Sequence, residues 1–284
     1  MRRVQLLTVG EAFEDLVFLK LERLPGPGEE IKTAGLVSTI GGGAIITAIA
    51  ATRLGVRCRA ISAVHTAGSR RLRQEGVVLT NLKRPSEPHA ISISLSTLSD
   101  RSFVTFNGIN DRLEPRLLRA VAPVASARHV HFALQPRNCR RWEAVVGNLR
   151  RRAMTTSWDF GWNDALVGDR HFPSLLKAVD YLFLNAQEAQ LYARRSSLRA
   201  AVGVWRGHPR TVVLKLGVGG SRWLSKGIDL SAPARKIRAV DTTGAGDAFN
   251  GGFLAGVLRG LPPGACLRLG NFVGAMSTRS AGGL

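Results

Sequence analysis

The stretch RAVDTTGAGDAFNGGFLAGVLRG, residues 238–260, decides how the rest of the chain is interpreted. Gly244, Ala245 and Gly246 have little or no side chain, so their backbone N–H groups can approach a ligand, and the helix predicted after them directs its positive end there. This combination predicts an anion-binding cradle. Asp247 falls in the first turn, where the helix end should keep it ionised and able to accept a proton from a hydroxyl. An acidic residue after a tight turn also fits an ordinary helix start.

The hydrophobic pattern around this stretch predicts an α/β fold. Short apolar runs alternate with helical segments, which is typical of a parallel sheet covered by helices on both faces. Ile31–Ile40 is predicted as an edge strand, and the segment from Ala90 to Phe106 as a hairpin that turns at Ser99 and Asp100. We therefore expect a single domain over residues 1–284, with a small β-sheet projecting from it, formed from about residues 13–40 and 89–107.

The composition excludes several classes of protein. A chain of 284 residues that is 45% hydrophobic can bury a large core. No run of about 18 apolar residues is present and the start lacks a signal-peptide cleavage site, so we expect a cytoplasmic protein without a membrane anchor. Cys58, Cys139 and Cys266 are odd in number and far apart, which predicts inert core thiols.

The charge is strongly basic. The formal net charge is +20, from 40 Lys and Arg against 20 Asp and Glu, and the basic residues are spread along the whole chain. A nucleic-acid protein would more often gather them into one stripe interleaved with aromatic residues. We therefore predict no specific nucleic-acid partner, but an arginine-rich solvated surface with a bias towards anionic small substrates.

The segment from Asp241 to Phe249 has the form D-T-x-G-A-G-D-x-F and resembles the C-terminal signature of the ribokinase-like (PfkB) carbohydrate kinase family. The resemblance extends from Gly10 to Gly283. It implies a three-layer α/β/α sandwich with a central, mostly parallel sheet and a small β-sheet lid. It also implies a phosphotransferase that uses ATP and Mg²⁺ and takes an alcohol group of a sugar or sugar-like molecule as acceptor. Asp247 would be the general base, and the Gly244–Gly246 backbone the anion hole.

Further motifs agree with this resemblance and imply roles for other residues. GEAFEDL places Asp15 at the sugar hydroxyls, and Gly41 and Gly42 match the family's diglycine motif at the substrate. The motifs NAQE, KLGVGG and LRLGNFVGAMSTRSAGG resemble the metal and nucleotide segments. The implied nucleotide residues are Asn185, Lys215, Gly217, Gly220 and Asn271; Glu188 would hold Mg²⁺ through water, and Asp241 and Thr243 a monovalent cation such as K⁺.

The chain also departs from the family pattern. Ile46 replaces the asparagine that binds sugar hydroxyls, so we expect poor activity on plain ribose or fructose and an acceptor with an apolar portion or an anionic group held by arginine. The segment Ala63–Val77 is shorter than usual and lacks a Gly-Asp pair, and NAQEA stands where NEXEA is common. The sequence stops at Leu284, where relatives continue with another helix, so we expect the nucleotide and cation sites to be incomplete.

Two alternatives remain open at this point. Within the family, a nucleoside kinase is compatible with an apolar Ile46 beside a base. A member that has lost catalysis and only binds or senses a ligand is the second alternative. Retention of Asp247 argues against that reading. The family resemblance also suggests a homodimer formed through the lid sheets.

Overall fold

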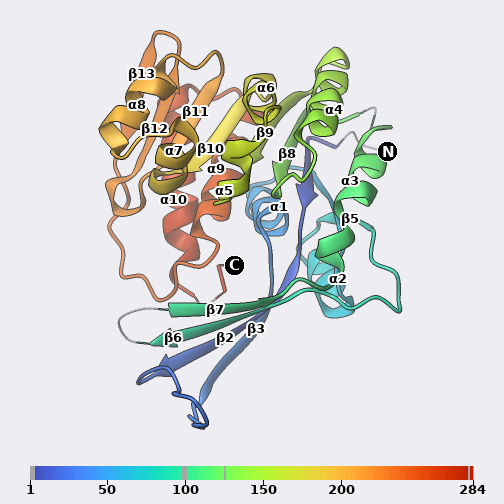
Figure 1. Ribbon diagram of the computed structural model, residues 1–284, viewed down its shortest axis with the longest axis vertical. Helices are drawn as coiled ribbons and strands as arrows, with labels where there is room; N and C mark the ends of the chain where they lie inside the picture. The colour runs from blue at the N-terminus through green and yellow to red at the C-terminus, as the bar shows by residue number, and fades with distance from the viewer. Residues whose placement is uncertain (1–3, 98–100, 125, 281, 284) are drawn as a thin grey trace.

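The computed structural model describes residues 4–97, 101–124, 126–280 and 282–283. Its main body contains a nine-stranded sheet in the order β13-β12-β11-β10-β9-β8-β1-β4-β5, parallel from β11 to β5, with β12 and β13 added antiparallel at one edge (Figure 1). The strands are β1 (Leu6–Gly10), β4 (Cys58–Ser62), β5 (Val78–Asn81), β8 (His129–Ala133), β9 (Thr155–Asp159), β10 (Tyr181–Asn185), β11 (Thr211–Lys215), β12 (Ser221–Ser225) and β13 (Ile228–Ala232). The central strands are short, nearly continuous apolar runs because helices bury both of their faces.

Helices cover the two faces of this sheet. One face carries α1 (Gly43–Arg53), α2 (Thr66–Gln74), α9 (Ala245–Leu258) and α10 (Pro263–Ser277). The other carries α3 (Glu114–Val121), α4 (Cys139–Arg151), α5 (Asp164–Gly168), α6 (Phe172–Ala178), α7 (Ala186–Ala193) and α8 (Leu198–Arg206). Two short 3₁₀ turns are η1 (Gly108–Arg112), before α3, and η2 (Gly217–Gly219), between β11 and β12. This arrangement confirms the predicted three-layer α/β fold.

Helix α9 is buried on almost every side, which explains its run of small and apolar residues. A Cβ atom on Gly251 would come within 2.7 Å of the Thr47 carbonyl oxygen in α1, and one on Gly252 within 2.9 Å of the Leu269 carbonyl oxygen in α10. These glycines therefore let α9 pack closely against both neighbouring helices. The close packing fixes the start of α9 relative to the start of α1.

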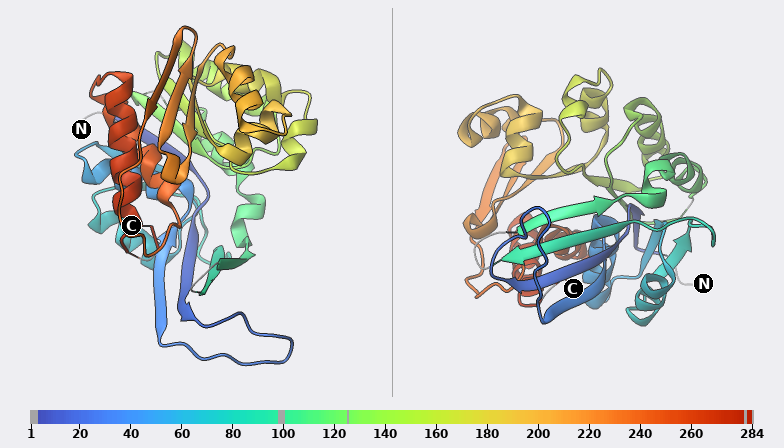
Figure 2. Two further views of the ribbon diagram at one scale, coloured as in Figure 1. Left: turned by 90° about the vertical axis from the view of Figure 1, so that its left-hand side faces the viewer. Right: turned by 60° about the horizontal axis from the view of Figure 1, so that its bottom comes forward.

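A second sheet of four strands, in the order β3-β2-β6-β7, stands apart from the main body (Figures 1 and 2). Its strands are β2 (Phe13–Leu21), β3 (Gly35–Gly41), β6 (Ile91–Thr97) and β7 (Arg101–Phe106). The prediction that a strand begins at Ile31 is wrong, since β3 begins only at Gly35; the Thr33 hydroxyl instead donates to the Leu19 carbonyl. The predicted turn at Ser99 and Asp100 lies outside the described residues.

Two predictions on composition can be compared with the fold. Cys58, Cys139 and Cys266 are buried free thiols, and burial raises the pKa of Cys58 and of Cys139 to about 12. These thiols therefore stay protonated and are poor nucleophiles. No helix in the described ranges is long and apolar enough to span a membrane.

Candidate active site

Polar side chains gather at the carboxyl ends of β9, β10 and β11, at the edge of the large sheet that faces the small one (Figure 1). Register pairs Asp159 with Phe183, and Asn185 with Lys215, so the alternation along each strand places Asp159, Asn185 and Lys215 on the same face. Ligands of open α/β sheets bind beyond these strand ends. The topology therefore brings residues from distant parts of the sequence to one place.

The start of α9 forms the predicted cradle. Gly244 caps the helix in the left-handed region at φ 70°, and no side chain caps the first turn. A Cβ atom on Gly244 would lie 2.6 Å from Ile46 Cδ1, and one on Gly246 would lie 3.3 Å from Lys215 Nζ. The glycines thus permit both the backbone turn and the close approach of an ammonium group. The arrangement offers backbone donors and one cation to an anion.

Asp247 lies in the first turn of α9, partly buried against the start of α1. A Cβ atom on Gly43 would come within 2.9 Å of Asp247 Oδ1, and the Thr47 hydroxyl donates to the Asp247 carbonyl oxygen at 3.0 Å. Burial, and then the negative charge of Asp159, raise the pKa of Asp247 to about 7, against the opposing effect of Lys215. The expectation that the helix end keeps this group ionised holds only in part at neutral pH, because desolvation opposes the helix end. A carboxyl with pKa near 7 suits a general base.

A buried ion pair supports the cradle from the sheet. Lys215 Nζ lies 2.5 Å from Asp159 Oδ2, and Asn250 Nδ2 donates to the same oxygen at 2.7 Å. Burial favours the neutral acid, but Lys215 and Asn250 hold the pKa of Asp159 below its usual range. Likewise, burial opposes the charge on Lys215, yet Asp159, Glu188 and Asp247 keep its pKa raised. Lys215 therefore stays a cation beside Gly246.

Sequence reasoning missed Asp159 and Asn250. The available signals were an aspartate at the end of the strand TTSWDF and a lone asparagine inside an otherwise small and apolar helix. A buried asparagine needs hydrogen-bond partners, so its presence in α9 indicates a polar neighbour on the sheet. Lys215, predicted at the nucleotide-binding strand, faces Asp159 and the cradle.

Asn185 and Glu188 form a capping box at the start of α7. The Asn185 side chain accepts from the Glu188 N–H at 2.9 Å, and the two Glu188 oxygens accept from the Asn185 backbone and side chain at 2.8 and 2.7 Å. Burial, and then the charge of Asp159, raise the pKa of Glu188 to about 7, although Lys215 lowers it. The motif NAQE therefore has a helix-capping role and also presents a carboxyl next to the charged cluster.

Asp15 projects from β2 onto the predicted diglycine. A Cβ atom on Gly41 would lie 1.9 Å from Asp15 Oδ2, and one on Gly42, which has φ 102°, would lie 2.4 Å from the Glu11 carbonyl oxygen. Only glycine at these positions leaves room for the carboxylate and the chain. Burial, and then the charge of Asp241, raise the pKa of Asp15 to about 7. Asp15 is thus a nearly buried carboxyl held at the start of α1.

Ile46 is 2% exposed and packs with Ala50 and Ala248 between α1 and α9. A Cβ atom on Gly244 would lie 2.6 Å from Ile46 Cδ1, so the Ile46 side chain packs directly against Gly244. The expectation that Ile46 forms an apolar wall for the acceptor is therefore not supported by its burial. Its visible role is to support the glycine cradle from below.

The predicted cation residues Asp241 and Thr243 contact the last described residues of the chain. Asp241 Oδ1 accepts from the Thr243 N–H and Oδ2 from the Gly282 N–H, each at 2.9 Å. A Cβ atom on Gly283 would lie 2.3 Å from the Thr243 carbonyl oxygen. Asp241 therefore ties the segment before α9 to the end of the chain, and the cation role of Asp241 and Thr243 stays a prediction.

The predicted nucleotide residues differ in what they contact: Gly217 and Gly220 lie in a turn, and Asn271 binds the protein backbone. Gly217 and Gly220 adopt φ 57° and 86° in the turn after β11, and nothing lies within 4 Å of a Cβ on Gly217. Asn271 donates to the carbonyl oxygens of Ala232 and Pro233 at 3.1 and 3.0 Å. Its amide N–H groups therefore tether the segment after β13, a role that the sequence did not indicate.

Comparison with known proteins agrees with this geometry. The model of the pfkB family of carbohydrate kinases matches residues 4–284. Acarbose 7(IV)-phosphotransferase from Actinoplanes sp. is 32% identical over 191 residues, which cover 65% of this chain and 60% of that relative's own length.

Solved structures share the fold. Adenosine kinase from Sinorhizobium meliloti aligns with a TM-score of 0.82 at 22% identity, over 98% of this chain and 95% of its own. An Escherichia coli protein described as a ribokinase II, in complex with ATP and Mg²⁺, aligns with a TM-score of 0.80 at 20% identity, over 99% of this chain and 94% of its own. These likenesses confirm the ribokinase-like fold, and the family match over almost the whole sequence shows that the chain belongs to the pfkB family of carbohydrate kinases.

Proposed function

We propose that this kinase transfers the γ-phosphoryl group of ATP to a hydroxyl of a sugar or sugar-like molecule. The observation that carries the proposal is the position of Asp247, a carboxyl with pKa near 7 at the lip of the glycine cradle and next to the start of α1. Asp247 takes the proton of the acceptor hydroxyl. At the same time the hydroxyl oxygen bonds to the γ-phosphorus, and the bond between this phosphorus and the oxygen that leaves with ADP breaks. Geometry and charge stabilisation are the main demands of this reaction.

The cradle and Lys215 stabilise the charge that develops. The backbone N–H groups of Gly244–Gly246 are fixed in direction by α9, so they need no reorganisation as negative charge builds on the phosphoryl oxygens. Lys215 adds a full positive charge at Gly246, and Asp159 with Asn250 holds it in place. Asp15, pressed on Gly41, accepts hydrogen bonds from other hydroxyls of the acceptor and so orients the reacting one.

The residues present fit Mg²⁺ bound with a nucleotide. Mg²⁺ is usually held by one or two carboxylates, waters and substrate phosphates, not by a protein cage, and no group of three or more potential metal ligands occurs in the part of the chain described. Glu188, whose carboxyl is fixed by Asn185 next to the charged cluster, would hold the ion through water. When bound, Mg²⁺ neutralises phosphate charge. Gly217, Gly220 and Asn271 stay predictions for the nucleotide.

The small sheet is proposed to act as a lid and as a dimer surface. Asp15 lies on the face of β2 that turns to the site, so water would be excluded when this sheet covers the acceptor. The opposite face carries Leu36, Val104 and Phe106, which are 57, 62 and 56% exposed. An exposed apolar patch of this kind marks an interaction surface. A second copy of the chain is its proposed occupant, with Val104→Lys expected to yield monomers by light scattering.

The proposal also covers the cellular compartment and the role of the many arginines. The kinase is proposed to act in the cytoplasm, where ATP is available. Its arginines are proposed to serve the surface and not a specific nucleic acid, since several are already paired with acids, as Arg53 is with Glu75 and Arg222 with Asp229. Duplex DNA binding should therefore disappear at physiological salt.

The acceptor is tested by a screen. ATP consumption and thermal shift are measured with ribose, fructose, ribose phosphates, nucleosides and oligosaccharides, in the presence of Mg²⁺. Saturable ATP consumption with one sugar-like compound supports the proposal. A preference for nucleosides would favour the nucleoside-kinase alternative. Binding without phosphorylation of any compound, together with unchanged binding by Asp247→Asn, would contradict catalysis and identify a ligand-binding member.

A further inference from the structure

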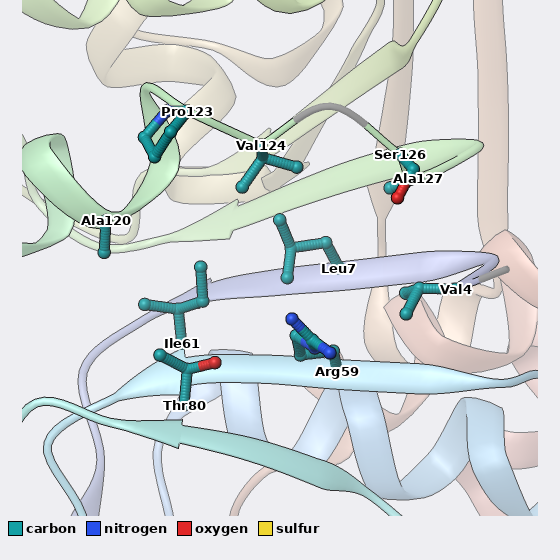
Figure 3. Close-up of a pocket in the computed structure, with 10 residues that line it drawn as sticks. All are labelled: Val4, Leu7, Arg59, Ile61, Thr80, Ala120, Pro123, Val124, Ser126 and Ala127. Atoms are coloured by element: carbon teal, nitrogen blue, oxygen red, sulfur yellow. The ribbon is translucent and has the colours of Figure 1, made fainter. Parts of the chain in front are cut away.

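A pocket of about 360 Å³ lies on the face of the large sheet opposite α1 and α9 (Figure 3). Strands β1, β4 and β5 form its floor, and its rim is formed by the end of α3 together with Pro123, Val124, Ser126 and Ala127. The lining residues are Val4, Leu7, Arg59, Ile61, Thr80, Ala120, Pro123, Val124, Ser126 and Ala127. Its volume falls in the range of about 300–1,000 Å³ that is typical of small-molecule sites.

Strand register explains why these side chains meet. Leu7 pairs with Arg59, and Ile61 pairs with Thr80, so their side chains rise on the same side of three adjacent strands (Figure 3). The pocket lies on the opposite face of the sheet from Asp159 and Lys215. It is therefore separate from the proposed phosphotransfer site.

Arg59 is the unusual member of this lining. Its Nε atom is buried and has no hydrogen-bond partner, and no ion pair of its guanidinium occurs among the described residues. By contrast, Arg53 pairs with Glu75 and Arg116 with Glu87. A buried donor without an acceptor is unfavourable, and a charged one more so. The fold thus holds a guanidinium beside a pocket that contains no carboxylate to pair with it.

The rest of the lining restricts the ligand that would pair with Arg59. Leu7, Ile61, Pro123 and Val124 make the walls mainly apolar, and Thr80 supplies one hydroxyl. A guanidinium binds a carboxylate with two parallel hydrogen bonds. An apolar wall favours a ligand with an organic body, whereas inorganic phosphate would lose its hydration without replacing it. We propose that this pocket binds a small carboxylate with an apolar body, held by Arg59 with the help of Thr80.

The experiment uses the full chain and phenylacetate as the probe. Isothermal titration and thermal shift are measured with phenylacetate, with the neutral analogue 2-phenylethanol and with inorganic phosphate. We expect saturable binding of phenylacetate, at least tenfold weaker binding of 2-phenylethanol, and no phosphate binding that Arg59→Met weakens, because phosphate held at the Gly244–Gly246 cradle does not depend on Arg59. Equal binding of the neutral analogue, or phosphate binding that Arg59→Met weakens, would overturn the assigned ligand class.

Variants separate the pocket from unspecific attraction by a basic protein. Arg59→Met keeps the apolar stem and should weaken phenylacetate binding at least tenfold, whereas Arg70→Met, on the exposed side of α2, removes the same charge and should leave it unchanged. Ala120→Leu fills the pocket with Arg59 intact and should also weaken binding. Unchanged binding in both pocket variants would refute the site. Asp247→Asn should bind phenylacetate like the parent chain, so failure of the kinase proposal would leave this result intact.

Discussion

Two halves of one sheet face differ sharply in this kinase. At the carboxyl ends of the strands, Asp159, Lys215 and Glu188 form a charged cluster next to Asp247. Two and four residues before Asp159 on β9, on the same face, lie Ser157 and Thr155, which pair with His131 and His129 of β8. Both halves are polar and largely buried, apart from Thr155 at the exposed start of β9. The first retains groups that titrate near neutral pH, whereas burial lowers the pKa of His129 to about 3 and of His131 to about 4.

Hydrogen bonds link His131, Ser157, His129 and Thr155, here called the histidine half, into a chain in which every donor points the same way along the chain. The Thr155 hydroxyl donates to the Arg128 carbonyl at 3.2 Å, so it accepts from His129 Nδ1 at 2.7 Å. His129 Nε2 then accepts from the Ser157 hydroxyl at 2.7 Å, and Ser157 accepts from His131 Nδ1 at 2.8 Å. Reversing the chain would give up the bond to Arg128. Both imidazoles are therefore neutral, with the proton on Nδ1.

Buried polarity alone does not mark a site. In the histidine half, nearly every donor meets an acceptor, and the groups stabilise the sheet. In the carboxylate half, acids outnumber cations, pKa values are raised, and glycines keep space open at Gly41, Gly43 and Gly246. Excess charge together with glycine clearance is what indicates chemistry.

The largest expected effect is that of Asp247→Asn. Loss of a positioned base should lower kcat by about 100-fold or more, with little change in nucleotide affinity. Steady-state kinetics at saturating acceptor and nucleotide titration measure the two quantities. Asp164→Asn, which changes an exposed acid in the first turn of α5, is the matched control and should retain full activity. Equal turnover of both variants would remove Asp247 from the mechanism.

Gly41→Ala should have the next largest effect. The new Cβ would lie 1.9 Å from Asp15 Oδ2, so the carboxylate must swing away from the acceptor. Because only the end of a side chain moves, we expect the melting temperature to change little while kcat/KM for the acceptor falls by about 10–100-fold. Gly203→Ala in α8, where nothing lies within 4 Å of a new Cβ, controls for the added methyl group. A normal kcat/KM in Gly41→Ala would show that Asp15 does not orient the acceptor.

In the carboxylate half, activity and stability should depend on pH with opposite signs. Asp247 must be ionised to act, so kcat/KM should fall about tenfold per unit as pH drops below its pKa of about 7. Stability moves the other way. The raised pKa values of Asp15, Glu188 and Asp247 favour the protonated folded state, so their contribution is complete below pH 4 and is lost as pH rises through 7. Rate profiles, and melting curves of the nucleotide-free protein compared with those of Asp247→Asn, check both trends; a difference between the two melting curves that does not change with pH would contradict the assignment.

Ser157→Ala breaks the histidine half without touching the cluster. It leaves His129 Nε2 and His131 Nδ1 without their shared partner, which should cost about 1–3 kcal/mol of unfolding free energy while kcat stays within about twofold. Ser62→Ala removes a buried hydroxyl that has no partner in the described ranges and should be nearly neutral. Denaturant unfolding measures both variants. With only six histidines in the chain, ¹⁵N spectra can also report the Nδ1–H tautomers, and Nε2–H forms would refute the direction of the chain.

Much of the fold could be predicted from the sequence because local signals agreed with it. Apolar runs gave the strands, and the small-residue helix after Asp247 gave the buried α9. The residues of the D-T-x-G-A-G-D-x-F motif come together with Asp15 and the diglycine as the family resemblance implied, although their roles stay predictions.

Other features depended on contacts that no local pattern contains. The pairing of Lys215 with Asp159 joins strands 56 residues apart in sequence. The tether made by Asn271 depends on where the segment after β13 passes. The ionisation of Asp247 could be predicted only in part because the helix end is a local feature, whereas desolvation depends on the packing of α1 and β9 around it.

Ile46→Asn is expected to have the smallest effect. It tests whether position 46, below the Gly244–Gly246 cradle, contacts the acceptor or only supports the cradle. Ile46 is 2% exposed under Gly244, so an asparagine there replaces packing between α1 and α9 with an amide next to the backbone donors. If the amide reaches the acceptor, kcat/KM for ribose relative to the best acceptor of the screen should rise by up to about tenfold, the value of one hydrogen bond. Progress curves of both chains on ribose, fructose and that acceptor measure the ratio, and Ile46→Val serves as the apolar control. A ratio unchanged in Ile46→Asn, with stability reduced, would show that position 46 only supports the cradle, and that acceptor choice lies with Asp15 and the lid.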